Sequence, residues 1–253
     1  MKIGAQLYTV RQYTQTDADI EETFKKIAGI GYTCVQVSGI GKIPPRRLAG
    51  ISAESGLDIA VTHTDPERVL RDTANVIEEH MLWGCGYVGI GYMPVQYRGS
   101  LEGCRTFISD FDQVARMMAH KGIKLVYHNH AFDFERFGGK TVFDVLVEET
   151  APDRWGFIPD TYWITVGGRC PAGQIEALAG RAEICHFKDM AISGGKQVMT
   201  PVMEGNMLWE EIFAACLKAG VGCAMVEQDD TYGTDPFEAL KISYNNLKKA
   251  GFS

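Results

Sequence analysis

Residues Lys124–Phe134, KLVYHNHAFDF, decide the fold that the sequence predicts. A short apolar run leads directly into two histidines, His128 and His130, which are separated by one residue. Alternate residues of a strand point to the same side, so both imidazoles would project from one face. The alternative is a pair of hydrogen-bonded structural histidines. Because imidazole nitrogens are costly to bury unless something binds them, the stretch favours a buried strand whose carboxyl end opens into a site.

The same pattern recurs along the chain: an amphipathic helix, a glycine or turn, and a short apolar strand that ends in polar residues. Clear instances are AGIGYTCVQVS, ESGLDIAVTHT, WGCGYVGIGY, HKGIKLVYHN and KAGVGCAMVEQD. Strands that alternate with helices predict a parallel sheet with helical crossovers. The predicted strands lie within 1–10, 31–39, 57–64, 84–94, 124–134, 154–163, 182–190 and 221–230. The predicted helices lie within 20–30, 47–55, 66–82, 101–120, 143–149, 208–220 and 236–250.

Eight such units in 253 residues fit a (β/α)8 TIM barrel of the α/β class. No linker or change of composition divides the chain, so a single domain over residues 1–253 is predicted. The alternative is an open doubly wound sheet, which would normally bring a glycine-rich turn after the first strand. The chain has TVRQYTQTD at that point, and the barrel is therefore favoured.

Composition narrows the functional classes. The formal net charge of −7 argues against a nucleic-acid surface, because phosphate binding requires a basic face. No stretch has the roughly 18 consecutive apolar residues that a membrane span needs, and MKIGAQLYTVRQYT at the start shows no signal peptide. The seven cysteines are scattered and form no CxxC motif, as expected for reduced thiols in a cytoplasmic protein.

In a barrel of this type the carboxyl ends of the strands converge on one rim, where active sites are built. Polar residues at the predicted strand ends are Gln6, Tyr8, His63, His128, His130, Asp160, His186, Lys188, Glu227, Gln228 and Asp229. Three consecutive strands end in FIPD, EICH and AMVE, which places Asp160, His186 and Glu227 side by side. With one more ligand from strand five, they would form a mixed nitrogen and oxygen site for one divalent metal ion, Mn²⁺, Mg²⁺, Co²⁺ or Zn²⁺.

Each of these three residues also has a simpler interpretation. Asp160 is suited to cap a helix, and a lone histidine such as His186 is more often a hydrogen-bonded core residue. Glu227 is able to pair with Lys188 instead. It is their joint occurrence at successive strand ends that favours the metal site.

Six motifs lie along almost the whole chain from Gln6 onward: AQLYTVR, YHNHAFDFE, DTYW, HFKDM, EGNMLWEEI and VEQDD. Together they resemble those of the sugar phosphate isomerase/epimerase group of xylose isomerase-like barrels. The resemblance implies a (β/α)8 barrel with one divalent metal ion, typically held by Glu, Asp, His and Glu from strands five to eight. Asp160, His186 and Glu227 match three of these positions.

Strand five departs from the family pattern. Where the characterised epimerases carry a glutamate, often followed by Asn, this chain has His128 followed by Asn129. His128 aligns directly and is the predicted fourth metal ligand, with Glu135 from the following loop as the alternative. The change also removes one of the two glutamates that exchange protons with the substrate in those epimerases.

The predicted reaction is proton abstraction next to a carbonyl through a metal-stabilised enediolate, as an isomerase or epimerase of a sugar or keto-sugar. Glu227 is the predicted base, while His130 and Lys188 would supply the complementary acid or hold hydroxyl groups. For Lys188, a Schiff-base role and an ion pair with Asp189 or Glu227 are alternatives. Loss of a β-hydroxyl would instead make the protein a dehydratase of a keto-polyol, as in the related inosose dehydratases.

Gln6, His63, Trp163 and Gln228 are predicted to contact a small sugar or polyol substrate, although Trp163 also suits packing against the helices. The usual phosphate grip of a barrel uses backbone N–H groups after strands seven and eight. The corresponding segments here, EGNM and TYGTDP, are poor in glycine and rich in acid. An unphosphorylated substrate is therefore expected.

Two other functional classes compete with an isomerase. Apurinic endonucleases share the fold but use a three-metal cluster and a basic groove, whereas this chain has only 6 histidines and is acidic. A non-catalytic sugar-binding barrel would keep the scaffold without turnover, and the missing strand-five glutamate is consistent with it. Barrels of this kind often pair, and the aromatics and methionines after strand seven would suit a homo-oligomer.

Overall fold

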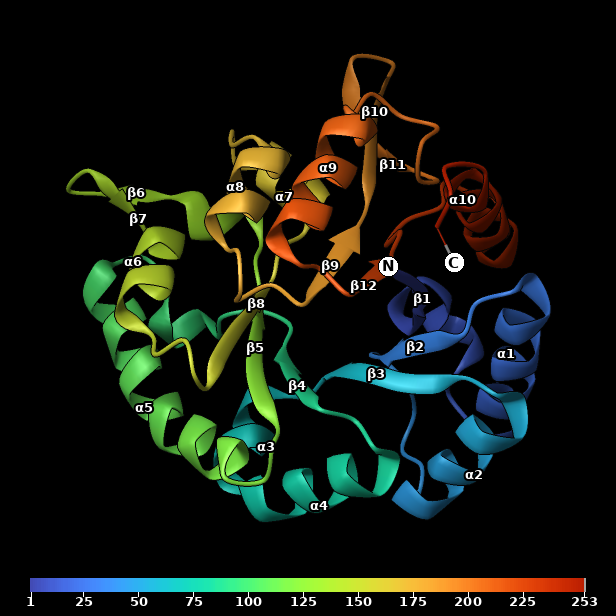
Figure 1. Cartoon of the computed structure of the whole chain (residues 1–253), viewed down its shortest axis with the longest axis horizontal. Coiled ribbons are helices and arrows are strands. Elements are labelled where there is room, and N and C mark those ends of the chain that lie inside the picture. The colour runs from blue at the N-terminus through green and yellow to red at the C-terminus, as the bar shows by residue number, and fades with distance from the viewer. Residues whose placement is uncertain (253) are drawn as a thin grey trace.

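Eight short strands with mostly buried side chains form the centre of the computed structural model, which describes residues 1–252. They are β1 (Lys2–Gln6), β2 (Cys34–Val37), β3 (Asp58–His63), β4 (Tyr87–Ile90), β5 (Lys124–His128), β8 (Trp155–Ile158), β9 (Ile184–Phe187) and β12 (Cys223–Val226). Neighbouring strands pair in parallel in the order β8-β5-β4-β3-β2-β1-β12-β9. Helices surround the strands (Figure 1), which confirms the predicted (β/α)8 barrel.

The barrel closes between β8 and β9, where the ladder of hydrogen bonds is short. One parallel bridge joins Asp160 and His186, and the backbone N–H of His186 donates to the carbonyl of Pro159 at 2.9 Å. Beside it, Oγ1 of Thr161 accepts from the backbone N–H of Lys188 at 3.0 Å and donates to its carbonyl at 2.8 Å. The seam of the barrel therefore contains two of the predicted metal ligands.

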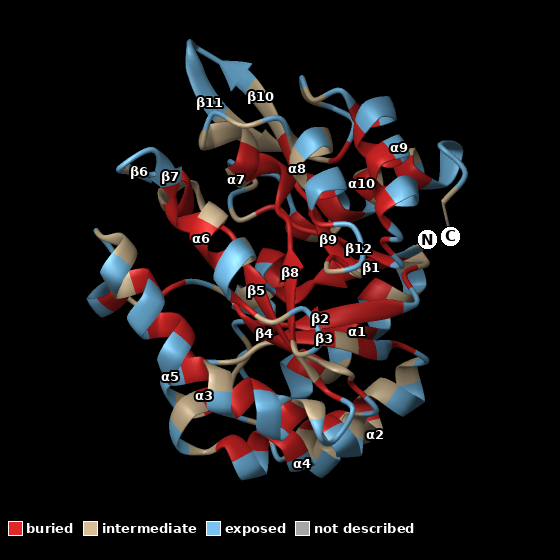
Figure 2. Cartoon of the chain, turned by 60° about the vertical axis from the view of Figure 1, so that its left-hand side comes forward, coloured by how far each residue is buried: buried red, intermediate tan, exposed pale blue. Residues whose placement is uncertain are grey.

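The outer layer consists of helices that bury one face against the strands and expose the other (Figure 2). The helices are α1 (Asp17–Ile30), α2 (Pro45–Ser55), α3 (Pro66–Arg71), α4 (Thr73–Trp83), α5 (Leu101–Ala119), α6 (Val142–Glu149), α7 (Thr161–Val166), α8 (Pro171–Ala177), α9 (Trp209–Ala219) and α10 (Pro236–Lys249). Short 3-10 helices are η1 (Leu7–Tyr13), η2 (Val95–Tyr97) and η3 (Ala131–Phe134). Two small hairpins are formed by β6 (Arg136–Phe137) with β7 (Lys140–Thr141) and β10 (Asp189–Ser193) with β11 (Lys196–Thr200).

Helix α5 illustrates how the sequence produces this layer. Its buried side chains include Cys104, Phe107 and Phe111, which recur at three- and four-residue intervals and so share one face. At its start, Oγ of Ser100 accepts a hydrogen bond from the backbone N–H of Gly103 at 3.0 Å, which satisfies a donor that has no partner within the helix. The apolar face and the cap together fix where the helix lies and where it begins.

Several elements differ from the sequence prediction, among them α7 and α8, which lie where no helix was predicted. The single helix predicted over 66–82 is divided into α3 and α4, because the backbone leaves the helical conformation at Asp72 (φ −129°, ψ 32°). The insertion after the seventh barrel strand begins with the β10–β11 hairpin, which was not predicted and which projects from the barrel (Figures 1 and 2). Gly138 and Gly139 form the turn between β6 and β7, and both glycines have positive φ.

Side chains that point into the barrel form two layers. The lower layer is apolar and contains Cys34, Val61, Val126, Ile158, Ile184, Cys223 and Met225. Two residues further along, where side chains point the same way, lie Gln36, His63, His128, Asp160, His186 and Glu227. The apolar layer lies nearer the amino-terminal ends of the strands, so these polar groups gather at the carboxyl-terminal mouth of the barrel.

Two predictions from composition concern reduced cysteines and the lack of a membrane-spanning segment. All seven cysteines are free thiols, and all but Cys170 are buried. The Sγ atoms of Cys34 and Cys223 lie 3.6 Å apart within the lower layer. Within residues 1–252, no helix is both long enough and apolar enough to cross a membrane.

Candidate metal centre

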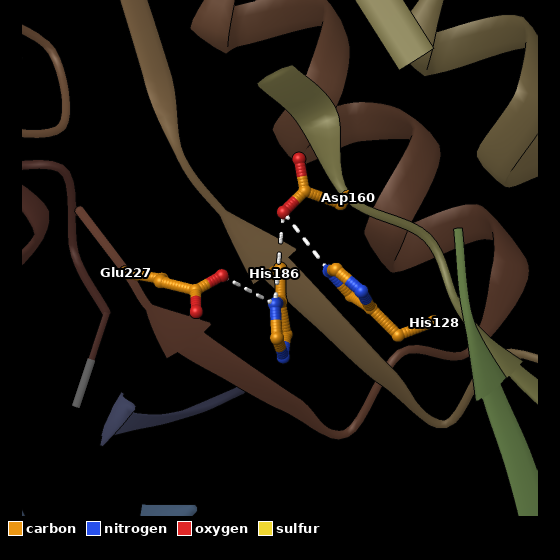
Figure 3. Close-up of side chains that lie close together, drawn as sticks. All are labelled: His128, Asp160, His186 and Glu227. Carbon is orange, nitrogen blue, oxygen red and sulfur yellow. Dashed lines mark hydrogen bonds and ion pairs between the residues drawn. The ribbon is translucent and has the colours of Figure 1, made fainter. Parts of the chain in front are cut away.

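Four buried side chains from the ends of β5, β8, β9 and β12 meet at the barrel mouth (Figure 3). One ligand atom from each of His128, Asp160, His186 and Glu227 lies within 4.8 Å of the others. Nε2 of His128 is 3.1 Å from Oδ2 of Asp160. Nδ1 of His186 is 3.6 Å from that same oxygen and 3.0 Å from Oε2 of Glu227. The structure thus brings together the four residues that the sequence analysis assigned to a metal ion.

The orientation of His128 fits a metal ligand. Its Nδ1 lies 3.0 Å from the carbonyl oxygen of Gly91, so Nδ1 carries the proton and donates it. Burial and the neighbouring His186 lower the pKa of His128, which favours the neutral ring. The Nε2 lone pair and Oδ2 of Asp160 then face each other as two acceptors, an arrangement that a cation between them would stabilise.

His186 is oriented in the same manner. Its Nε2 lies 2.6 Å from Oε1 of Gln36, to which it donates, so Nδ1 faces the two carboxylates. Burial alone would lower the pKa of His186, but Glu227 and Asp160 outweigh it and raise the pKa to about 9. Two carboxylates therefore create a strongly negative potential at this point. Imidazole and carboxylate ligands without a thiolate suit Mn²⁺, Mg²⁺, Co²⁺ or Zn²⁺.

The alternative fourth ligand lies elsewhere. Glu135 follows η3, is exposed, and is not part of the cluster. Asn129, which follows His128, is buried and accepts a hydrogen bond from the backbone N–H of Asp160 through Oδ1 at 3.0 Å. The geometry therefore favours His128 over Glu135, with Asn129 fixing the position of Asp160.

Lys188 lies beside the cluster and is 1% exposed. Its Nζ is 2.6 Å from Oδ2 of Asp229 and 3.3 Å from Oε2 of Glu227. Burial alone would lower the pKa of Lys188, but Glu227, Asp160 and Asp229 outweigh it and raise the pKa. A protonated amine is not a nucleophile, which argues against the Schiff-base alternative. Asp189 binds backbone groups of the following loop rather than Lys188.

His130 is stacked on Phe132, with ring centroids 5.4 Å apart and an interplanar angle of 7°. Burial lowers the pKa of His130 to about 3, so its ring is neutral, and its buried Nδ1 has no hydrogen-bond partner among residues 1–252. The carboxylate of Asp133 accepts from the backbone N–H of His130 at 2.8 Å and from the hydroxyl of Tyr127 at 2.9 Å. His130 is therefore held in place with one ring nitrogen unused.

The four predicted substrate contacts occupy different surroundings. His63 and His130 line a cavity of about 450 Å³ at the barrel mouth, together with Lys188 and Glu227. The buried Nε2 of His63 has no hydrogen-bond partner in the described chain. The ring of Trp163 lies 5.1 Å from that of His130, which places it at the edge of this group rather than among the lining residues.

Gln6 and Gln228 do not line the cavity. Gln6 is fully buried, and its Nε2 donates to Oε1 of Glu227 at 3.0 Å while its Oε1 accepts from the backbone N–H of Tyr8 at 2.9 Å. The amide of Gln228 donates to the carbonyl of Asp230 at 3.0 Å. Gln6 therefore contacts a predicted metal ligand and uses both polar atoms within the protein, whereas the buried Oε1 of Gln228 has no hydrogen-bond partner among residues 1–252.

Some residues of the site were not assigned from the sequence. Tyr8 and Tyr92 line the cavity and are 38% and 47% exposed, so their rings are available to a ligand. Tyr92 could have been noticed as an aromatic residue near the end of the strand predicted within 84–94. Gln36 could have been noticed as the polar residue in the buried strand CVQV. Its register partner on β1 is Gln6.

Three comparisons relate the chain to known proteins. Two crystal structures from Parabacteroides distasonis, each described as a sugar phosphate isomerase/epimerase, are 22% and 23% identical, with TM-scores of 0.85 and 0.83. Each match covers 99% of this chain, and 94% and 99% of those chains. A xylose isomerase-like TIM barrel protein from Mycobacterium smegmatis in complex with magnesium is 14% identical, with a TM-score of 0.77, covering 98% of this chain and 95% of that one. A comparison with curated protein sequences finds no significant match.

At these identities the solved structures establish the fold. The family is established by a sequence model described as xylose isomerase-like TIM barrel, which matches residues 24–250. That span includes seven of the eight barrel strands, all but β1, and all four residues of the cluster. The chain therefore belongs to the xylose isomerase-like TIM barrel family.

Proposed function

We propose that the protein is a divalent-metal-dependent isomerase or epimerase that removes a proton next to the carbonyl of a sugar or keto-sugar. The observation that carries the proposal is the buried cluster of two imidazoles and two carboxylates, and above all the two acceptor atoms of His128 and Asp160 that face each other at 3.1 Å. The fold neighbours described as sugar phosphate isomerase/epimerase are consistent with it.

His128, Asp160, His186 and Glu227 would hold the metal ion. When bound, a divalent cation supplies Lewis acidity that polarises a carbonyl and stabilises an enediolate. The protein's part is to hold the ligands still, and it does so from the ends of four different barrel strands.

Two carboxylates next to the cavity are candidates for proton transfer. Glu227 is ionised, because Lys188 and His186 outweigh the effect of burial and hold its pKa well below the usual range. Asp229 lines the same cavity, and burial together with Glu227 raises its pKa to about 6. A base whose pKa is close to neutrality is well matched to proton exchange at pH 7. We therefore assign Glu227 and Asp229 as the carboxylate pair that acts on the substrate, in place of the glutamate missing from strand five.

Three side chains would hold substrate hydroxyl groups. His63 and His130 each have one unpartnered ring nitrogen and line the same cavity as Lys188. Neutral imidazoles both donate and accept hydrogen bonds, as hydroxyl groups do. This arrangement suits a polyhydroxylated ligand.

The charges around the cavity favour an unphosphorylated substrate. Lys188 is the one cationic side chain of the lining, and it is already paired with Asp229 and Glu227. Asp65 adds a further negative charge. Phosphate recognition requires free cations or a set of backbone donors, so a neutral sugar or polyol fits better.

The second candidate is a dehydratase of a keto-polyol. The specific observation in its favour is the protonated Lys188, whose Nζ lies 3.3 Å from the proposed base Glu227. An ammonium group beside the base is able to protonate a leaving hydroxyl after the α-proton has been removed.

Metal analysis and deuterium exchange test the proposal. The purified protein is stripped with a chelator, reloaded with Mn²⁺, Mg²⁺, Co²⁺ or Zn²⁺, and incubated with a panel of neutral ketoses, aldoses and keto-polyols in D2O. We expect metal-dependent incorporation of deuterium at a carbon next to the carbonyl, with an epimer or isomer as product. A product lighter by one water would identify the dehydratase. Saturable sugar binding without exchange would show a binding protein and contradict both enzymes.

A further inference from the structure

Two glutamines on neighbouring strands lie beside the cluster at the barrel mouth. Gln6 on β1 and Gln36 on β2 are register partners in neighbouring parallel strands, and both are 0% exposed. Each contacts one residue of the cluster on another strand: Gln6 contacts Glu227 on the β12 side, and Gln36 contacts His186 on β9. They are therefore a matched pair in position and burial but differ in the ligand that they contact.

The contact of Gln36 has a chemical consequence for His186. A ring that binds a metal ion through one nitrogen is neutral and keeps its single proton on the other nitrogen, either Nδ1 or Nε2. The amide oxygen of Gln36 lies 2.6 Å from Nε2 and accepts its proton, which leaves the lone pair on Nδ1, the nitrogen that faces Asp160 and Glu227. The opposite tautomer would place an N–H on the cluster side, where it is unable to bind a cation.

The competing tautomer is a real alternative in this site. Oε2 of Glu227 is 3.0 Å from Nδ1 and would accept its proton readily. Without an acceptor at Nε2, the Nδ1–H form would gain that hydrogen bond and lose none. Gln36 opposes this outcome, because its hydrogen bond with Nε2–H stabilises the Nε2–H tautomer.

Gln36 also has a cost that packing alone does not explain. Its Nε2 is buried and has no hydrogen-bond partner within residues 1–252. A buried donor without a partner is unfavourable, and an apolar side chain of the same length would avoid it. The amide is therefore best explained by its oxygen, which contacts His186.

We infer that Gln36 is a positioning residue of the metal centre, which selects the tautomer of His186 that presents Nδ1 to the ion. The inference rests on the proposed metal centre and adds a determinant of its affinity. Gln36 touches no substrate atom in this scheme and acts only through His186.

The test compares the Mn²⁺ affinity of chelator-stripped variants by titration calorimetry, without any assay of turnover. Gln36→Met keeps the length and removes the acceptor, and we expect its affinity to fall about 10- to 100-fold, as is typical when the partner of a ligating histidine is lost. Gln36→Glu restores an acceptor oxygen and should recover most of that loss. Gln6→Met removes the matched amide beside Glu227, whose carboxylate has no tautomer, and should lose less affinity than Gln36→Met.

The outcomes separate this inference from the proposed function. A wild-type protein that binds no divalent ion would overturn both together. Wild-type affinity in Gln36→Met would overturn the inference and leave the metal centre standing. Equal losses in Gln36→Met and Gln36→Glu would also overturn it, since packing rather than the acceptor would then be responsible. Thermal melts of the metal-free variants check that each is folded before titration.

Discussion

At the scale of single residues, the positions of the protons on His128 and His186 determine which ring nitrogens face the carboxylates of the site. His128 and His186 each donate one ring N–H to a neutral acceptor, a backbone carbonyl or an amide oxygen. Their other nitrogens face Asp160 and Glu227. Both rings are thereby oriented before any ligand arrives, and the proposed proton transfer would use Glu227 of the cluster and Asp229 beside it.

Asp229 tests the proposed proton transfer without altering a metal ligand. In Asp229→Asn we expect deuterium exchange into the substrate to fall about 10²- to 10⁴-fold, as for loss of a general acid–base group. Mn²⁺ affinity should stay close to that of the wild type, because Asp229 is outside the cluster. The measurement is proton exchange by NMR together with a metal titration. Unchanged exchange would remove Asp229 from the mechanism.

Asp133 predicts a specific pH dependence of stability. Burial raises its pKa from 3.8 to about 7, so the folded protein holds a proton that the unfolded chain releases near pH 4. Because the folded state binds more protons in this window, the contribution of Asp133 to stability falls as pH rises from about 4 to 7. In Asp133→Asn the amide keeps bonds to His130 and Tyr127 without ionising.

Urea unfolding at several pH values measures this effect as a difference between wild type and Asp133→Asn. The difference is needed because burial lowers the pKa of His80 to about 4 and that of His130 to about 3, and such groups make stability rise with pH. We expect the variant to gain stability relative to the wild type as pH increases. A constant difference between the two proteins would contradict the assignment.

At the scale of elements, one carboxylate organises the loop that follows β11. Oδ2 of Asp189 accepts hydrogen bonds from the backbone N–H groups of Met203 and Gly205, at 2.9 and 3.0 Å, and from Nε1 of Trp209 at 2.7 Å. A Cβ on Gly205 would lie 2.5 Å from Oδ1 of Asp189, so only glycine fits there. Asp189 therefore connects the segment that follows β9 to the start of α9.

Asp189→Asn should therefore loosen this loop. The amide replaces one acceptor oxygen by an NH2 group. That NH2 group would face either the backbone N–H of Met190, at the Oδ1 position, or the three N–H donors that bind Oδ2. We expect a loss of about 1–3 kcal/mol in the free energy of unfolding, with faster proteolysis within 201–208. Glu210→Gln, an exposed position with the same change of charge, is the matched control and should behave as the wild type. Equal proteolysis of the two variants would contradict the role of Asp189.

The sequence predicted these elements to different degrees. Asp160, His186 and Glu227 were found because each directly follows an apolar run, and parallel barrel strands converge at one rim. The break at Asp72 was missed because the surrounding residues carry no Pro or Gly that would mark a helix end. The role of Gln36 was missed because a polar residue inside a strand shows its partner only once strand register is known. Gln6 was assigned to the substrate for the same reason.

For the whole molecule, the proposed centre predicts that metal binding stabilises the fold. An ion that binds only the folded state at 100 times its dissociation constant adds about 2.7 kcal/mol. For a chain of this size that corresponds to an increase of roughly 5–10 °C in melting temperature. His128→Gln, which removes one ligand, should lose most of this increase. Scanning fluorimetry of stripped protein with and without Mn²⁺ measures both, and an equal increase in wild type and variant would place the ion elsewhere.

Because the ladder between β8 and β9 is short, substitutions in the cluster affect the closure of the barrel as well as the metal site. Asp160 and His186 form the bridge at this junction and also belong to the proposed metal centre. An ion held by both would act as a cross-link between the two strands that complete the circle. Slower amide exchange at this junction should then accompany metal loading, and a weakened ligand would open the wall of the barrel as well as weaken metal binding.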